Sequence, residues 1–512
     1  MTGAERGTPS PAPVAAASTA TCVTILLLFC AWPIVNFAND NREQLSRADY
    51  GFLATAFIVT VAVVMAAFAA LGWIAGAPRR VRLVAALVAA VVLFYNYHLV
   101  FAALVEGFAF VRLTRGENYA YLAILVGVPL LVWFLPSGRI AAQALLVAAI
   151  ALFAMPAAGL AAHAMSDAKG PAVHAGAEAA RGSGARIKPN IYYLMTDGYG
   201  RADQLASRLG YDNSAFVDYL KGRGFYVADQ AYANYPMTYM SLPSSLAMDY
   251  LVTETTPKHT DRSSFYATIQ GRNPVVERLR SYGYTYAHMA SGVWDGSRCS
   301  GVEDVCLANS EEVVVAFFRM TPVSRLRRGE SVTTPRSVEV ALERLPSGRP
   351  TFLFAHIFSP HPPRTFEGDC ALRTTRGESL VYWKPSGKND YLRDIACTNR
   401  QLSGLIDRLL ERDPQAIVLL HSDHGPAFGI DWSLPNDRWT RDAFDERFAI
   451  LMALRLPSEC SALPYPTLSP VNLFRVVFAC LEGKPVERLA DDSYITAYEK
   501  NERQDPVLKY RR

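Results

Sequence analysis

The chain has 512 residues, of which 51% are hydrophobic and 19% are charged, so it has room for more than one domain. Its formal net charge is only +4, and no Lys/Arg-rich run interleaves with aromatic residues, so nucleic acid is not an expected partner. The hydrophobic residues are unevenly distributed, and the first third of the chain is typical of a membrane protein.

The N-terminal part predicts a membrane domain. Residues 1–18, rich in Ala, Pro, Ser and Thr, predict a disordered cytoplasmic tail. Five apolar runs follow, each approaching the roughly 20 residues that cross a bilayer. They cover residues 19–37, 51–76, 82–105, 116–135 and 140–162. The sequence therefore predicts a bundle of five transmembrane helices over residues 19–162. The first apolar segment is not a cleaved signal peptide, because it lies too deep in the chain and similar segments follow it.

Charges on the short loops predict the orientation of this bundle. Lys and Arg collect on the cytoplasmic side, and Arg79, Arg80 and Arg82 mark one inside loop while Arg139 marks another. An odd number of crossings then places the N-terminus inside and everything after about residue 163 outside.

The cysteines agree with an oxidising compartment for the second part of the chain. Cys22 and Cys30 lie in the first membrane segment, and six cysteines lie beyond the last one. Neighbours in sequence could form three disulfides: Cys299 with Cys306, Cys370 with Cys397, and Cys460 with Cys480. Other pairings and buried free thiols remain alternatives, whereas a zinc cluster is disfavoured because no C-x-x-C pair occurs.

Beyond the bundle, the sequence predicts a linker and an α/β domain. Residues 163–188, with several glycines among alanines, predict a flexible linker. Strand-like runs such as 351–357 and 416–420 then alternate with helix-like runs such as 399–412. This alternation favours a mostly parallel sheet in one extracytoplasmic domain over residues 189–500.

Two strand-like runs end in possible metal ligands. The apolar run from Ile191 ends in Asp197, and the run from Ile417 leads into Asp423 and His424. Ligands gather at the carboxyl ends of parallel strands, so we expect these three side chains at one edge of the sheet. Two carboxylates and an imidazole suit zinc or manganese. The alternative is that each Asp is an ordinary turn or helix-capping residue.

Hydroxyl groups cluster between these strands, in the run Asn234 to Leu246. A helix is expected to begin here. When a Thr or Ser lies at a helix N-terminus beside a cation, the helix dipole and the cation both favour the alkoxide form of its hydroxyl. Thr238 is one candidate nucleophile and Ser241 is a second, while simple N-capping is the alternative.

A proline-held loop, Ser359 to Pro363, follows the strand-like run that ends near Ile357. It carries His361, which could contact a phosphate or a second metal ion. His356 lies inside the strand pattern and is expected to be a core residue.

The order of four motifs resembles that of the sulfatase and alkaline phosphatase superfamily. The motifs are Asp197-Gly198, the Thr238 cluster, Ser359 to Pro362, and Ser422-Asp423-His424-Gly425. The resemblance covers residues 189 to about 480 and implies an alkaline phosphatase-like α/β/α sandwich. Within it, membrane helices before the domain resemble lipoteichoic acid synthases and lipid A phosphoethanolamine transferases. Those enzymes use a threonine nucleophile, and their T-x-x-S-x-P pattern is matched by Thr238, Ser241 and Pro243.

By this resemblance, Thr238 is the nucleophile and a metal ligand, Asp197, Asp423 and His424 complete the metal site, and His361 lies near the transferred group. The implied enzyme lies in the inner (cytoplasmic) membrane. It takes a phospho-headgroup from a membrane phospholipid donor and passes it to an acceptor, an envelope glycan or glycolipid.

Two departures keep other functions open. The transferases usually have Glu where this chain has Asp197, and true sulfatases need a C/S-x-P-x-R signature whose arginine is missing after Ser241 and Pro243. A hydrolase of the same superfamily, either a phosphodiesterase or a sulfuric ester hydrolase, is the first alternative. A glycan-binding scaffold without catalytic activity is the second.

Overall fold

A computed structural model describes most of the chain. The described residues are 18–42, 45, 47–76, 79–107, 117–135, 138–167, 184–256, 263–308, 312–325, 332–373, 383–432, 434–496 and 507–510. Except for Ser18, the expected cytoplasmic tail lies outside the described residues. The same is true of residues 168–183 of the expected linker, whereas residues 163–167 continue a helix.

The chain divides into two compact units. The helical unit comprises residues 1–170 and 313–327, and the α/β unit comprises residues 171–312 and 328–512. Residues 313–327 therefore belong to the helical unit, although the segments before and after them belong to the α/β unit. The sequence does not suggest this assignment.

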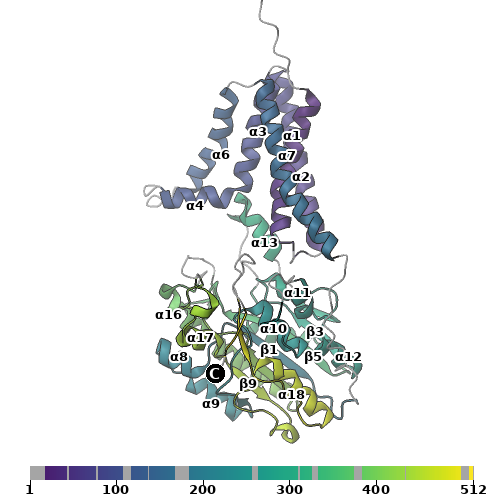
Figure 1. Cartoon of the computed structure of the whole chain (residues 1–512), viewed down its shortest axis with the longest axis vertical. Coiled ribbons are helices and arrows are strands. Elements are labelled where there is room, and N and C mark those ends of the chain that lie inside the picture. The colour runs from purple at the N-terminus through teal and green to yellow at the C-terminus, as the bar shows by residue number, and fades with distance from the viewer. Residues whose placement is uncertain are drawn as a thin grey trace, which may run out of the picture. The chain divides into compact units, whose positions relative to one another are not determined.

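The described part of the helical unit follows the expected apolar runs, with one difference. Its helices are α1 (Thr19–Asp40), α2 (Arg47–Ala75), α3 (Arg80–Tyr95), α4 (Tyr97–Gly107), α6 (Glu117–Phe134) and α7 (Arg139–Asp167). Stretches within α1, α2 and α7 are long and apolar enough to cross a membrane. The expected third span is divided at Asn96, and α4 runs across the direction of α3 (Figure 1). Five crossings therefore stay a prediction.

A short helix from the second half of the chain completes the core of the helical unit. In α13 (Glu312–Arg319), the side chains of Val313 and Phe317 are each only 3% exposed. The Phe317 ring packs edge-on against the rings of Phe37, Phe52 and Tyr95. The backbone N–H of Tyr97 donates to the Met320 carbonyl at 3.0 Å, just after the helix.

The α/β unit is built on a seven-stranded sheet in the order β2-β9-β8-β1-β5-β3-β4. The five strands from β8 to β4 are parallel, and β9 runs antiparallel to β8. This is the mostly parallel sheet that the sequence predicts. The strands are β1 (Ile191–Asp197), β2 (Tyr226–Val227), β3 (Thr285–Met289), β4 (Val305–Ala308), β5 (Thr351–Pro360), β8 (Ile417–Ser422) and β9 (Met452–Arg455). Short antiparallel pairs lie outside it: β6 (Phe366–Glu367) with β7 (Ala371–Leu372), and β10 (Ser493–Ile495) with β11 (Leu508–Tyr510).

Apolar side chains cover both faces of this sheet, because successive residues of a strand point to opposite sides. The helices of the unit are α8 (Ala202–Leu209), α9 (Ser214–Gly222), α10 (Thr238–Ala247), α11 (Ser263–Ile269), α12 (Pro274–Ser281), α14 (Pro335–Ala341), α16 (Lys388–Arg412), α17 (Arg441–Phe448) and α18 (Pro470–Glu482). Tyr193 and Met195 belong to one buried cluster with residues of α10, α12 and α18, while Tyr192 and Leu194 belong to a second with residues of α8, α9, α14 and α16. Burial on both faces explains why β1 and β8 are continuous apolar runs.

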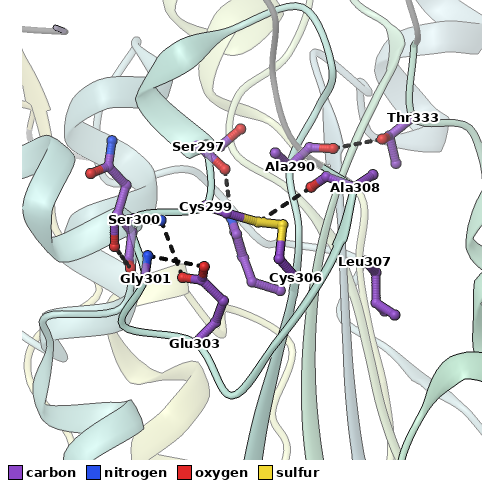
Figure 2. The surroundings of a disulfide bond; sticks show 12 residues. Ala290, Ser297, Cys299, Ser300, Gly301, Glu303, Cys306, Leu307, Ala308 and Thr333 are labelled. Atoms are coloured by element: carbon purple, nitrogen blue, oxygen red, sulfur yellow. Dashed lines mark hydrogen bonds between the residues drawn. A yellow bond between two sulfur atoms is a disulfide. The ribbon is translucent and has the colours of Figure 1, made fainter. Parts of the chain in front are cut away.

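The three predicted disulfides are confirmed, and all lie in the α/β unit. Figure 2 shows the Cys299–Cys306 bond, which closes the loop that leads into β4. The Glu303 carboxylate accepts hydrogen bonds from the backbone N–H groups of Ser300 and Gly301 in this loop. Although Glu303 lies near both sulfur atoms, sulfur atoms that are bonded to each other are not thiolate ligands for a metal.

Candidate active site

Two neighbouring parallel strands bring the predicted carboxylates together. β1 pairs with β8 up to Thr196 and Ser422, so Asp197 and Asp423 emerge at the same edge of the sheet. Both are buried, with Asp197 3% exposed and Asp423 fully covered. Two carboxylates that are distant in sequence therefore share one water-poor position at the sheet edge.

Backbone groups hold the loop after β8 in one position. Asp423 Oδ1 accepts hydrogen bonds from the N–H groups of Gly198, at 3.2 Å, and His424, at 2.9 Å. Gly425 packs so tightly that a Cβ atom there would lie 2.2 Å from the Glu446 carbonyl oxygen. Only glycine fits this turn without a shift of the backbone.

The two site histidines, His361 and His424, direct Nε2 toward the carboxylate oxygens of the cluster, so their Nε2 lone pairs and these oxygens converge on one position. His424 Nδ1 lies 3.0 Å from the Gly425 carbonyl and His361 Nδ1 lies 2.5 Å from the Pro362 carbonyl. A carbonyl only accepts hydrogen bonds, so in the neutral rings the proton is on Nδ1 and Nε2 is an acceptor. His424 Nε2 is 3.5 Å from Asp197 Oδ1 and 3.4 Å from Asp423 Oδ2, and His361 Nε2 is 4.0 Å from Asp197 Oδ1.

This cluster fits a metal ion. Asp197 Oδ1 and Asp423 Oδ2 are buried, and neither has a well-formed hydrogen bond to a described residue. The Thr238 hydroxyl is close enough to the Asp423 carboxylate to lower its pKa, although burial outweighs that effect. Asp197, His361 and His424 offer ligand atoms that all lie within 4.8 Å of one another. Acceptors that converge without a donor are suited to a cation, and mixed carboxylate and imidazole ligands suit zinc or manganese.

The electrostatics of the site agree with this fit. Burial raises the pKa of Asp197 to about 8, and burial together with the charge of Asp197 raises the pKa of Asp423 to about 7. Burial, followed by the positive charge of Arg447, lowers the pKa of His361 and of His424. The positive charge of Arg447 lowers the pKa of both carboxyl groups, but burial outweighs it, while the imidazoles stay neutral and able to ligate.

The hydroxyl of Thr238 lies at the same cluster. Helix α10 begins at Thr238, whose partly exposed side chain places Oγ1 3.3 Å from His424 Nε2. Ser241 is fully buried, and its hydroxyl donates to the Asp423 carbonyl at 2.7 Å. The two candidate nucleophiles thus differ in surroundings: the Thr238 hydroxyl faces the cluster, whereas the Ser241 hydroxyl binds the backbone of Asp423.

Arg447 joins the two loops that carry Thr238 and His424. Its buried guanidinium donates from Nε to the Pro236 carbonyl at 2.6 Å and from Nη1 to the Gly425 carbonyl at 2.8 Å. A buried arginine near the end of α17 has no sequence signature that distinguishes it from the many arginines of the surface, so the sequence does not reveal this role.

His356 is a second site residue that sequence reasoning misses. The strand pattern predicts a core residue, and His356 is fully buried, but its Nε2 lies 3.4 Å from Asp197 Oδ2. The register contains the signal, because His356 pairs with Met195, which lies on the same face of β1 as Asp197. A buried histidine at that register contacts the carboxylate from the neighbouring strand.

This chain is similar to a known protein family and to several solved structures. The sulfatase family model matches residues 189–448. The periplasmic domain of EcEptC from Escherichia coli has 14% identity and a TM-score of 0.39, covering 63% of this chain and 93% of that one. The lipooligosaccharide phosphoethanolamine transferase EptA from Neisseria meningitidis has 13% identity and a TM-score of 0.36, covering 92% and 97%. No curated protein matches this chain.

Proposed function

This chain belongs to the sulfatase family, and we propose that it is a membrane-bound, metal-dependent transferase of phospho-headgroups. The donor is a membrane phospholipid, the headgroup is of the phosphoethanolamine or phosphoglycerol type, and the acceptor is an envelope glycan or glycolipid. One observation carries the proposal: the partly exposed Thr238 hydroxyl lies 3.3 Å from His424 Nε2, within a buried set of unpaired metal-type ligand atoms.

The proposed reaction has two displacements. Thr238 Oγ1 attacks the phosphorus of the donor, so a threonine–phosphorus bond forms and the bond to the diacylglycerol oxygen breaks. The proton from Thr238 ends on the released diacylglycerol. A hydroxyl or amine of the acceptor then attacks the same phosphorus, its proton returns to Thr238, and the headgroup leaves on the acceptor.

The chain's own residues prepare Thr238 for this role. Asp197, Asp423 and His424 would hold the metal ion with Thr238, and a zinc or manganese ion there supplies a Lewis acid that favours the alkoxide of threonine. The N-terminus of α10 adds its positive dipole end at the same hydroxyl. His361 would contact the transferred group, and its 26% exposure and its position beside the cluster support this role.

The membrane helices fit a donor that stays in the bilayer. Among the described residues, three helices long and apolar enough to span it precede the catalytic residues, and the three disulfides suit an oxidising compartment. The proposal therefore retains five crossings over residues 19–162, a linker at 163–188, and an extracytoplasmic α/β/α sandwich over 189–500 at the inner membrane.

A hydrolase is the second candidate, and the match to the sulfatase family favours it. The same residues would act, with water as the acceptor of the threonine-bound group.

The test uses the full-length protein in lipid nanodiscs that contain phosphatidylethanolamine or phosphatidylglycerol, with and without zinc. Peptide mass spectrometry measures the mass of the peptide that carries residue 238. We expect this peptide to gain the mass of one headgroup, with release of diacylglycerol, in the wild type and in Ser241→Ala. Thr238→Ala should gain nothing and lose turnover by about a thousandfold or more.

Other results would assign the chain differently. An adduct that survives Thr238→Ala and disappears in Ser241→Ala would make Ser241 the nucleophile. In nanodiscs that also contain an acceptor glycolipid, release of free headgroup without modification of that acceptor would establish the hydrolase. A protein that binds no metal and turns over neither phosphodiesters nor sulfate esters would be a scaffold.

A further inference from the structure

A buried arginine lies beside the site, and the described residues do not supply a full set of hydrogen-bond partners for it. Arg364 follows the His361 loop and is only 3% exposed. Its guanidinium carbon lies 4.7 Å from the ring centre of Trp383, 5.2 Å from that of Tyr391 and 5.7 Å from that of Phe428. Three aromatic rings thus enclose a positive charge away from water.

The hydrogen bonds of Arg364 are incomplete. Nη1 donates to the Pro360 carbonyl at 2.5 Å, whereas Nε and Nη2 are buried and donate to no described residue. The nearby Asp394 carboxylate already accepts from the backbone N–H groups of Thr365 and Phe366, at 2.9 and 3.0 Å. A buried guanidinium with unpaired N–H groups is costly unless something binds it.

Trp383 connects this arginine to the active site. Its ring centre lies 5.3 Å from that of His361, and a Cβ atom on Gly198 would touch the same indole at 3.1 Å. The guanidinium is therefore one indole ring away from His361.

We propose that Arg364 binds a negatively charged oxygen of the substrate, of phosphoryl or sulfuryl type, on the His361 side of the site. The planar fork of Nε and Nη2 suits two oxygens of such a group, and exclusion of water strengthens the contact. The inference rests on the proposed function, because it names the charge of the group that the site receives.

The experiment compares Arg364→Met and Arg364→Lys with the wild type, all as full-length, zinc-loaded protein in nanodiscs. Arg408→Met is the matched control, because Arg408 is exposed and pairs with Glu343. Titration calorimetry measures the dissociation constants of inorganic phosphate and of inorganic sulfate, and thermal unfolding measures stability. KM and kcat for the phospholipid are measured in parallel.

We expect Arg364→Met to weaken binding of the preferred anion by about 10- to 100-fold and to raise KM more than it lowers kcat. Its thermal midpoint should equal or exceed that of the wild type, since an unpaired buried charge is removed. Arg364→Lys should restore part of the affinity, and the anion bound more tightly by the wild type identifies phosphoryl or sulfuryl chemistry.

Unchanged dissociation constants in both variants would overturn the inference. So would a lower thermal midpoint in Arg364→Met with wild-type anion binding, which would make Arg364 structural. Anion binding that depends on Arg364 in a protein without transferase turnover would support the inference while removing the proposed transfer reaction.

Discussion

At the scale of single residues, hydrogen bonds to backbone carbonyls decide which atoms face the cluster. Gly425 and Pro362 fix the proton of each site histidine on Nδ1, so both Nε2 atoms are left as acceptors. His356 has the opposite role, because it can donate from Nε2 to Asp197 Oδ2. Such a donor orients a carboxylate ligand and increases its hold on a metal ion.

Replacing His356 with Gln should therefore weaken metal binding. Loss of the imidazole removes the contact at Asp197 Oδ2, and we expect zinc affinity to fall by about 10- to 100-fold. Competition titration with a chromogenic chelator measures this change. His421→Gln is the control, because His421 is equally buried but contacts the Tyr193 hydroxyl. Equal zinc affinity in the wild type and His356→Gln would contradict the orienting role.

The fully buried His288 predicts a loss of stability in acid. Burial lowers its pKa from 6.5 to about 4, so between these values the unfolded chain takes up a proton that the folded chain refuses. Stability from this group is complete above pH 6.5 and is lost as pH falls to about 4, by about 3 kcal/mol. The thermal midpoint of His288→Gln should fall less steeply than that of the wild type over this interval. Parallel curves would show that His288 is protonated in the folded protein.

At the scale of elements, the sequence predicts the strand ends but not what supports them. Asp197 and Asp423 are predictable, because a long apolar run that ends in a carboxylate is typical of a buried parallel strand with a ligand at its carboxyl end. Arg447 and Arg364 are not, since burial of an arginine depends on contacts between distant segments. The division at Asn96 coincides with the polar residues Asn96 and His98, which interrupt the third apolar run, but polar residues within such a run do not by themselves show that the helix ends there.

The tight turn after His424 predicts that Gly425 cannot be replaced without a loss of stability. Gly425→Ala would bring a Cβ atom to 2.2 Å from the Glu446 carbonyl oxygen, so the Asp423–His424 loop must shift. We expect a thermal midpoint several degrees lower and weaker zinc binding. Gly404→Ala is the matched control, because Gly404 is exposed on α16 with no atom within 4 Å, where alanine should stabilise the helix by roughly 0.5–1 kcal/mol. Equal midpoints for the two variants would contradict this account.

At the scale of the whole molecule, the chain passes between its two units more than once. Residues 1–170 and 313–327 share one core, which the apolar pattern does not predict because residues 313–319 read as an ordinary amphipathic helix of the α/β domain. Phe317 fills a position among three aromatic rings of the helical unit. The anchor of this protein is thus not a purely N-terminal element.

Phe317→Asp should consequently destabilise the helical unit. A buried aromatic side chain would be replaced by a charge without a partner, at a cost of about 3–5 kcal/mol. Thermal unfolding and the fraction of monodisperse protein in detergent measure the effect. Val340→Asp, at a position 64% exposed on α14, controls for the added charge and should behave like the wild type. A stable, monodisperse Phe317→Asp protein would show that α13 adds nothing to this core.

The place of α13 also sets an order of events during biosynthesis. The ribosome completes α7 well before it makes α13, so the inserted helices first exist with the Phe317 position unfilled. The bundle can reach its final packing only after β3 and β4 have been synthesised and the following segment has come back to it. In the proposed topology, membrane insertion and folding of the exported α/β unit would therefore be coupled in time, and a ribosome stalled before residue 313 would hold a helical unit that is inserted but incomplete.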